Sequence, residues 1–89
     1  MSGPEYAIEM ALVRDLNKYG FDTLKLRTPG TNGVPDRIIF MPKWSPGPPV
    51  FVELKAPGKF LRALQVELIA DWSLRGADVR PFVYTVNAS

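Results

Sequence analysis

Two short polar motifs constrain the fold of this 89-residue chain more than any other feature. The first covers residues 33–36 and ends in Asp36, and the second covers residues 53–55, with Glu53 at its start and Lys55 at its end. Gln65 follows ten residues after that lysine. If the motifs lie on neighbouring strands, both carboxylates converge where they could hold a divalent cation beside the lysine. We therefore expect a sheet that places the two motifs side by side.

The composition limits the chain to one small core and to oxygen ligands for any metal. Eighty-nine residues with a hydrophobic fraction of 46% suffice for a sheet covered by two helices, in a single domain over residues 1–89. The sequence has no cysteine and no histidine, which excludes disulfides, thiolate sites and the usual zinc ligands. A metal bound by oxygen atoms alone is expected to be magnesium or manganese.

Neither hydropathy nor net charge identifies a partner. No apolar run approaches the roughly 20 residues of a membrane span. The N-terminus also lacks the basic-then-apolar order of a signal peptide, so we expect an intracellular protein. The formal net charge of +2 is too modest to indicate a nucleic-acid partner by itself.

The apolar pattern predicts helices and strands in the order αβββαβ. In residues 4–19, Ile8, Leu12 and Leu16 recur at helical intervals together with Tyr19, and Gly20 follows as a stop. A second helix is expected over residues 61–75, and strands are expected over residues 21–27, 37–41, 50–55 and 79–86. This is an α/β fold with a mixed central sheet flanked by helices.

Side-chain alternation in residues 50–55 places Phe51, Glu53 and Lys55 on one face of a strand. A lone acid and base two residues apart are more often an ordinary surface pair. Asp36, which follows a proline, has an ordinary role too, as a turn residue that accepts backbone hydrogen bonds. The interpretation shifts toward metal chemistry because the two motifs occur together and a glutamine follows them on an apolar helix face.

Polar residues also occupy helix positions where apolar ones are expected. Glu5 and Glu9 project within or beside the first-helix stripe, and Asp15 projects near it, so helical phase selects no single acid. Gln65 lies inside the apolar stripe of the second helix, which consists of Leu61, Leu64, Leu68, Ile69 and Trp72. A buried amide needs partners. The ordinary alternative is that the acids complement the helix dipole and that Gln65 caps loop backbone.

Taken together, these motifs resemble the VRR-NUC (virus-type replication-repair nuclease) family of the PD-(D/E)xK nuclease superfamily, particularly its short stand-alone phage form. The resemblance covers the helix acids and residues 29–37, 51–58 and 64–65. It implies a restriction-endonuclease-like core, a divalent metal and hydrolysis of DNA phosphodiesters. By position it assigns Asp36 and Glu53 as metal ligands, Lys55 as the catalytic lysine and Gln65 as a supporting residue. The Leu54 backbone carbonyl is expected to add a further ligand.

A second resemblance suggests which acid of the first helix belongs to the active site. Archaeal Holliday-junction resolvases share this superfamily core and have a helix glutamate followed by a Gly-Phe pair. The arrangement of Glu9 with Gly20 and Phe21 is similar to that pattern. We therefore take Glu9 as the active-site acid of the first helix and keep Glu5 as the alternative.

Basic residues beside the motifs are candidates for DNA phosphate contacts, with solubilising surface charge as the ordinary alternative. They are Lys25, Arg27, Arg37, Lys59 and Arg62.

A single copy of so small a domain offers little surface for binding a duplex, so we expect a homodimer with two active sites on branched or junction DNA. Trp44, Phe60 and Trp72 are possible interface anchors, although each is expected more often in a core. The chain would act in the host cytoplasm if it is encoded by a phage.

Two other functional classes remain open at this point. One is a catalytically inactive DNA-binding module that keeps the nuclease fold, and the other is a plain interaction domain in which the motifs are turns and surface pairs. The intact set of Asp36, Glu53 and Lys55 argues against a decayed site, because a degenerate site is expected to lose at least one of them.

Overall fold

The computed structural model describes residues 4–55 and 58–83 and has the predicted αβββαβ order. Its elements are α1 (Pro4–Lys18), β1 (Asp22–Lys25), β2 (Arg37–Phe40), β3 (Val50–Lys55), α2 (Ala63–Leu74) and β4 (Asp78–Val83). The expected strand over residues 21–27 is shorter than predicted, and the expected helix over residues 61–75 starts two residues later. Residues 84–86, the end of the expected last strand, lie outside the described residues.

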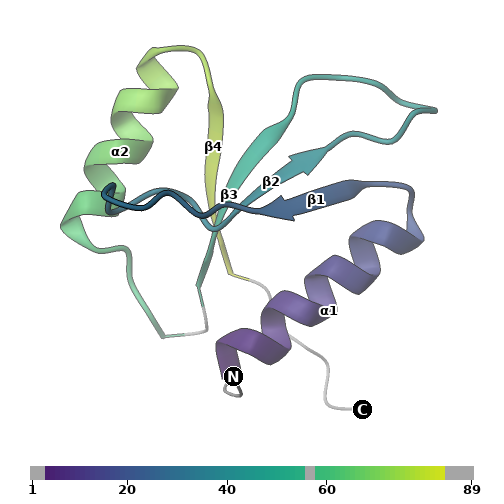
Figure 1. The fold of residues 1–89 in the computed structure, drawn as a ribbon, viewed down its shortest axis with the longest axis horizontal. Helices are drawn as coiled ribbons and strands as arrows, with labels where there is room; N and C mark the ends of the chain where they lie inside the picture. Colours follow the sequence, from purple (N-terminus) through teal and green to yellow (C-terminus); the bar gives the residue numbers. More distant parts are fainter. Residues whose placement is uncertain (1–3, 56–57, 84–89) are drawn as a thin grey trace.

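The four strands form one mixed sheet in the order β1-β2-β3-β4 (Figure 1). β1 pairs with β2 and β2 pairs with β3 in antiparallel fashion, whereas β3 and β4 are parallel. Parallel neighbours need a long crossover connection, and α2 supplies it between β3 and β4. The sheet is therefore mixed because one helix interrupts a run of antiparallel strands, which confirms the predicted fold class.

Alternation along β3 directs its two faces toward different helices. Val52, which is buried, lines an apolar cavity together with Leu12 of α1 and Ile39 of β2. Phe51 points to the other face, where the centroid of its ring lies 5.1 Å from that of the Trp72 ring on α2 in an edge-to-face contact. Figure 1 accordingly shows α1 and α2 on either side of the sheet. Neither helix, within residues 4–55 and 58–83, is long and apolar enough to cross a bilayer.

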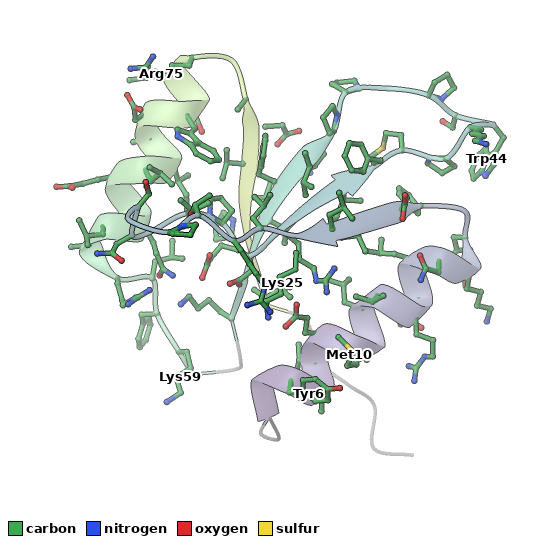
Figure 2. The ribbon with its side chains drawn as sticks, in the orientation of Figure 1. Tyr6, Met10, Lys25, Trp44, Lys59 and Arg75 are labelled. Carbon is green, nitrogen blue, oxygen red and sulfur yellow. The ribbon has the colours of Figure 1, made fainter. Side chains whose placement is uncertain are left out.

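Several apolar side chains that were expected inside the domain are exposed. Tyr19 is 61% exposed and Leu64 is 52% exposed, so the predicted helix stripes were wrong at these positions. Core packing was also the wrong expectation for Trp44 and Phe60, which are 77% and 86% exposed, although Trp72 does pack on Phe51. The physical reason is size, because a domain this small cannot cover both its connections and the outer faces of its helices. Figure 2 shows Trp44 at the tip of the connection between β2 and β3.

The connection between β1 and β2 reaches across to the start of α2 (Figure 1). Its base is closed by a 2.8 Å hydrogen bond from the Leu26 amide to the Asp36 carbonyl oxygen. Gly33 has φ of 84°, and a Cβ atom at this position would lie 2.7 Å from the Leu64 carbonyl oxygen. Pro35 is fully buried. The connection is therefore packed directly against α2, and Asp36 is held beside β3 as a result.

We predict that Gly33→Ala destabilises the domain much more than Gly30→Ala, as measured by denaturant unfolding. Gly30 has nearly the same φ of 82° but no atom within 4 Å of a new Cβ, so its substitution should cost only the left-handed strain of about 1–2 kcal/mol. Gly33→Ala adds a collision with backbone, worth a further ~1–3 kcal/mol. Equal losses for the two variants would contradict the close packing of this connection on α2.

Candidate active site

A cleft of about 390 Å³ opens where β2 begins, β3 ends and α2 begins. Its lining contains the cluster predicted from the sequence, namely Asp36, Glu53, Leu54, Lys55 and Gln65, together with Lys59, Phe60 and Arg62. The strand pairing explains this convergence. Asp36 directly precedes β2, and β2 runs antiparallel to the half of β3 that leads to Glu53.

Asp36 is fixed beside β3 by its own side chain. Its Oδ2 accepts a 2.9 Å hydrogen bond from the Leu54 amide. The ordinary role considered for this residue was to accept backbone hydrogen bonds within a local turn. Here the amide belongs to another strand, 18 residues along the chain, so the aspartate joins the two predicted motifs.

Glu53 lines the cleft and is only 3% exposed. Its Oε2 accepts a 2.6 Å hydrogen bond from Gln65 Nε2 and lies 3.3 Å from Lys55 Nζ. Its Oε1 is buried and has no hydrogen-bond partner among the residues that the structure describes. A buried carboxylate oxygen without a partner is costly, which makes this atom a candidate ligand for a cation.

Gln65 connects the carboxylate of Glu53 to the first turn of α2. Its Oε1 accepts a 2.8 Å hydrogen bond from the Arg62 amide at the N-terminal end of the helix. Because the amide oxygen is used there, the NH₂ group must face Glu53, which fixes the orientation of the side chain. Both expectations for this glutamine therefore apply, since it caps backbone and also supports the site.

Burial and repulsion from a neighbouring carboxylate disfavour negative charge on each of the two acids. Desolvation raises the pKa of Asp36, and nearby Glu9 acts in the same direction, while the Leu54 amide and Lys55 oppose them. Desolvation also raises the pKa of Glu53, followed by repulsion from Asp36, with Lys55 acting against both. A divalent cation between the two acids would offset both effects, so their surroundings fit a metal site.

A donor set of two carboxylates and a backbone carbonyl would suit magnesium or manganese, with water completing the shell. No cluster of three or more acidic, histidine or cysteine side chains occurs within the described ranges 4–55 and 58–83. A metal here would rest on Asp36, Glu53 and the Leu54 carbonyl. Magnesium is commonly held by one or two carboxylates and keeps several waters, so two acids are sufficient.

Glu9 was predicted as an active-site acid, but its carboxylate pairs with two basic side chains outside the cleft. Its Oε2 lies 2.8 Å from Arg37 Nε, and its Oε1 lies 3.2 Å from Lys25 Nζ. Arg37 Nη1 also donates to the Thr23 hydroxyl at 3.4 Å. These contacts join α1 to β1 and β2, on the face of the sheet away from α2. Glu9 does not line the cleft, and its influence there is the electrostatic one on Asp36. The side chain of Glu5 is outside the described residues.

The predicted DNA-binding residues separate into three groups. Lys59 and Arg62 are exposed and line the cleft. Lys25 and Arg27 are exposed but do not line it, and Figure 2 shows Lys25 at the end of β1, away from Lys59. Arg37 is buried, with 7% of its surface exposed, and is held by Glu9. Phe60 was not predicted as a residue of the cleft, and no periodicity in its connecting segment signals such a role.

Comparisons with known proteins bear on the fold and on the class of relatives. No protein-family model matches the sequence. The chain is 44% identical over 55 residues to a protein of Acyrthosiphon pisum secondary endosymbiont phage 1 described as "Putative nuclease p44", and the match covers 62% of this chain and 56% of that protein. It also superposes on a solved structure described as "VRR_NUC domain" with a TM-score of 0.79 and 24% identity, covering 94% of this chain and 87% of the other. The chain has the VRR_NUC fold. The predicted resemblance is thereby confirmed at the level of the fold.

We predict that Gln65→Ala lowers the free energy of unfolding by about 1.5–3 kcal/mol, because it removes a charge-assisted hydrogen bond from buried Glu53. Chemical denaturation would measure the loss. Glu67→Ala is the matched control, since Glu67 is exposed on the same helix, and it should change stability by less than about 0.5 kcal/mol. If the two variants unfold alike, the hydrogen bond does not support the cleft.

We predict that Asp36→Asn gains stability relative to the wild type as pH rises in the absence of metal. The raised pKa of Asp36 means that the folded state favours the protonated carboxyl, so the wild type loses stability as pH rises from the ordinary value of 3.8 through the raised one. Asparagine cannot ionise, and its oxygen can still accept from the Leu54 amide.

The measurement is denaturant unfolding in EDTA from about pH 4 to pH 8, with Glu67→Gln as an exposed carboxylate control. The advantage of Asp36→Asn over the wild type should grow through the window above pH 3.8 and then level off. An advantage that shrinks as pH rises would contradict the destabilising effect of burying this charge.

Proposed function

We propose that the chain is a metal-dependent deoxyribonuclease of the PD-(D/E)xK type. The observation that carries the proposal is the meeting of Asp36, Glu53 and Lys55 in one cleft, with Glu53 Oε1 buried and unpartnered among the described residues. The VRR_NUC fold and the phage relative named as a nuclease support the same reaction class. The substrate would be a DNA phosphodiester, cut within a branched or junction structure during replication, repair or recombination.

A magnesium or manganese ion would be held by the Asp36 and Glu53 carboxylates and by the Leu54 carbonyl. When bound, such an ion supplies polarisation of the phosphate and acidification of a coordinated water. The chain has no histidine to act as a general base. Binding the ion is therefore the main contribution that the two carboxylates make to the reaction.

The remaining residues of the cleft have distinct roles in this proposal. Lys55, 3.3 Å from Glu53 Oε2, donates a hydrogen bond to the phosphate and stabilises its developing negative charge. Gln65 keeps Glu53 oriented toward the ion, while Lys59 and Arg62 bind flanking phosphates. Glu9 is a positioning residue, because its contact with Arg37 anchors the first residue of β2 next to Asp36.

A homodimer inside the cell is the proposed acting form. Two copies present two active sites and twice the basic surface, as cutting both arms of a branched DNA requires. The alternative is a non-catalytic DNA-binding module with the same fold. The complete set of acids, lysine and supporting glutamine favours the enzyme over this alternative.

We predict cleavage of DNA that requires magnesium or manganese and stops in EDTA. Four-way junctions, flaps and plain duplexes of matched sequence would be incubated with purified protein, and the products resolved on denaturing gels. Asp36→Asn, Glu53→Gln and Lys55→Ala should each lower the cleavage rate by at least about 100-fold, because each removes a group that acts on the phosphate or the ion. Asp71→Asn, which alters an exposed carboxylate on α2, should cleave like the wild type.

A second measurement separates binding of the ion from catalysis. Manganese should raise the melting temperature of the wild type and of Lys55→Ala, but much less that of Asp36→Asn, in which one of the two negatively charged ligands is replaced by a neutral amide. DNA binding without cleavage under every metal condition would support the non-catalytic module. Cleavage at wild-type rate by any of the three site variants would remove that residue from the proposed mechanism.

A further inference from the structure

The side chain of Phe60 is exposed at the edge of the candidate active site. It is 86% exposed, on the connection between β3 and α2, and it lines the cleft that contains Asp36 and Glu53. Within the described part of the chain, no ring-stacking or cation-π contact involves it. Single exposed apolar residues are common on protein surfaces and need no function. The position of this phenyl ring beside the two acids is what distinguishes it from the others.

Phe60 supplies the apolar wall of an otherwise polar cleft. Leu54 is the other lining residue with an apolar side chain, but alternation along β3 directs that side chain to the opposite face from Glu53. The remaining lining residues carry charged or amide groups. A ligand in this cleft therefore meets acids and cations on its polar part and one aromatic face on its apolar part.

Basic residues flank this aromatic side chain along the sequence and in the cleft. Lys59 precedes it directly, Arg62 follows two residues later, and both line the same cavity. Figure 2 shows Lys59 on this connection, below α2 in that view. Cationic side chains next to an exposed aromatic ring are typical of surfaces that bind the phosphates of a nucleic acid strand while a base stacks on the ring.

We propose that Phe60 forms a stacking subsite for an unpaired DNA base next to the phosphate held in the cleft, an inference that rests on the proposed function. In an intact duplex both faces of a base are covered by its neighbours. A phenyl ring can therefore stack only on a base that has lost a neighbour, as at a flap, a junction or a single-stranded end. Phe60 is thus a specificity residue that selects DNA with unpaired bases.

The alternative partner for the exposed Phe60 ring is a second copy of the chain. Leu64, 52% exposed on the first turn of α2, would then join Phe60 in an apolar interface. The centres of protein interfaces are depleted of charged groups, whereas the surroundings of Phe60 include Lys59, Arg62 and the two acids. The chemistry around the ring favours a nucleic acid over a protein surface.

The test combines a change in the protein with a change in the DNA. Binding to a labelled flap would be measured by fluorescence anisotropy in EDTA, so that no cleavage occurs, with a normal or an abasic nucleotide at the unpaired position next to the branch. For the wild type, the abasic site should weaken binding about five- to 100-fold, the range of a lost stacking contact. For Phe60→Ala, the same abasic site should have no further effect, because the ring it would stack on is gone.

Two variants control for the nature of the contact. Phe60→Trp should keep the sensitivity to the abasic site, while Phe60→Leu, which retains apolar bulk without an aromatic face, should lose it. Leu74→Ala removes an apolar side chain that is 89% exposed at the far end of α2 and should behave like the wild type. Phe60→Ala should also reduce cleavage of flaps more than that of plain duplexes in manganese.

The outcomes separate this inference from the proposed function. If the wild type cleaves DNA but the abasic site weakens binding equally in wild type and Phe60→Ala, the stacking subsite is refuted while the nuclease stands. If nothing is cleaved but the abasic effect depends on Phe60, the subsite stands and the nuclease fails. A shift from dimer to monomer in Phe60→Ala by light scattering, without any base dependence, would assign the ring to a protein interface instead and overturn the inference.

Discussion

The buried carboxylate of Glu53 determines how the rest of the cleft is arranged. A charge this far from water must be compensated, and Gln65 and Lys55 compensate one of its two oxygens. The other oxygen has no partner among the described residues and lies in the same cleft as Asp36. The strand pairing and the start of α2 hold the partners of this carboxylate in place. The arrangement lowers the stability of the fold, because two acids are kept close together where they are poorly hydrated. The same closeness is what a site for a divalent cation would need.

The sheet separates two polar networks that look alike in the sequence. On the α2 face, Glu53 meets a lysine and an amide and keeps one oxygen uncompensated. On the α1 face, Glu9 uses both oxygens, one for Arg37 and one for Lys25. The first network leaves one carboxylate oxygen without a partner among the described residues, whereas in the second both oxygens of the carboxylate are paired with basic side chains. This difference, rather than the presence of acids as such, is what marks the first as the candidate active site.

Local rules were enough to predict which residues meet at the centre of the candidate site. The period of two along a strand is imposed by the backbone, so the shared face of Glu53 and Lys55 followed from the sequence, and a glutamine in an apolar stripe indicated a buried partner. The placement of Arg37 did not follow, because it depends on which face of β2 is covered by α1, which is a property of the whole sheet. The exposure of Leu64 was missed for a related reason, since helical phase gives no information on how much of a small domain its neighbours can cover. Phe60 lies on a connection, where no periodicity predicts exposure.

The approach of Gly33 to the backbone of Leu64 links parts of the chain that are made at different times. The connection that carries Asp36 precedes α2 in the sequence, yet it is supported by the first turn of that helix, and Gln65 belongs to the same turn. Both acids therefore depend on one later element for their positions. A nascent chain would carry its acids long before it could hold them together. In such an architecture the cleft would take shape only after most of the domain had been synthesised.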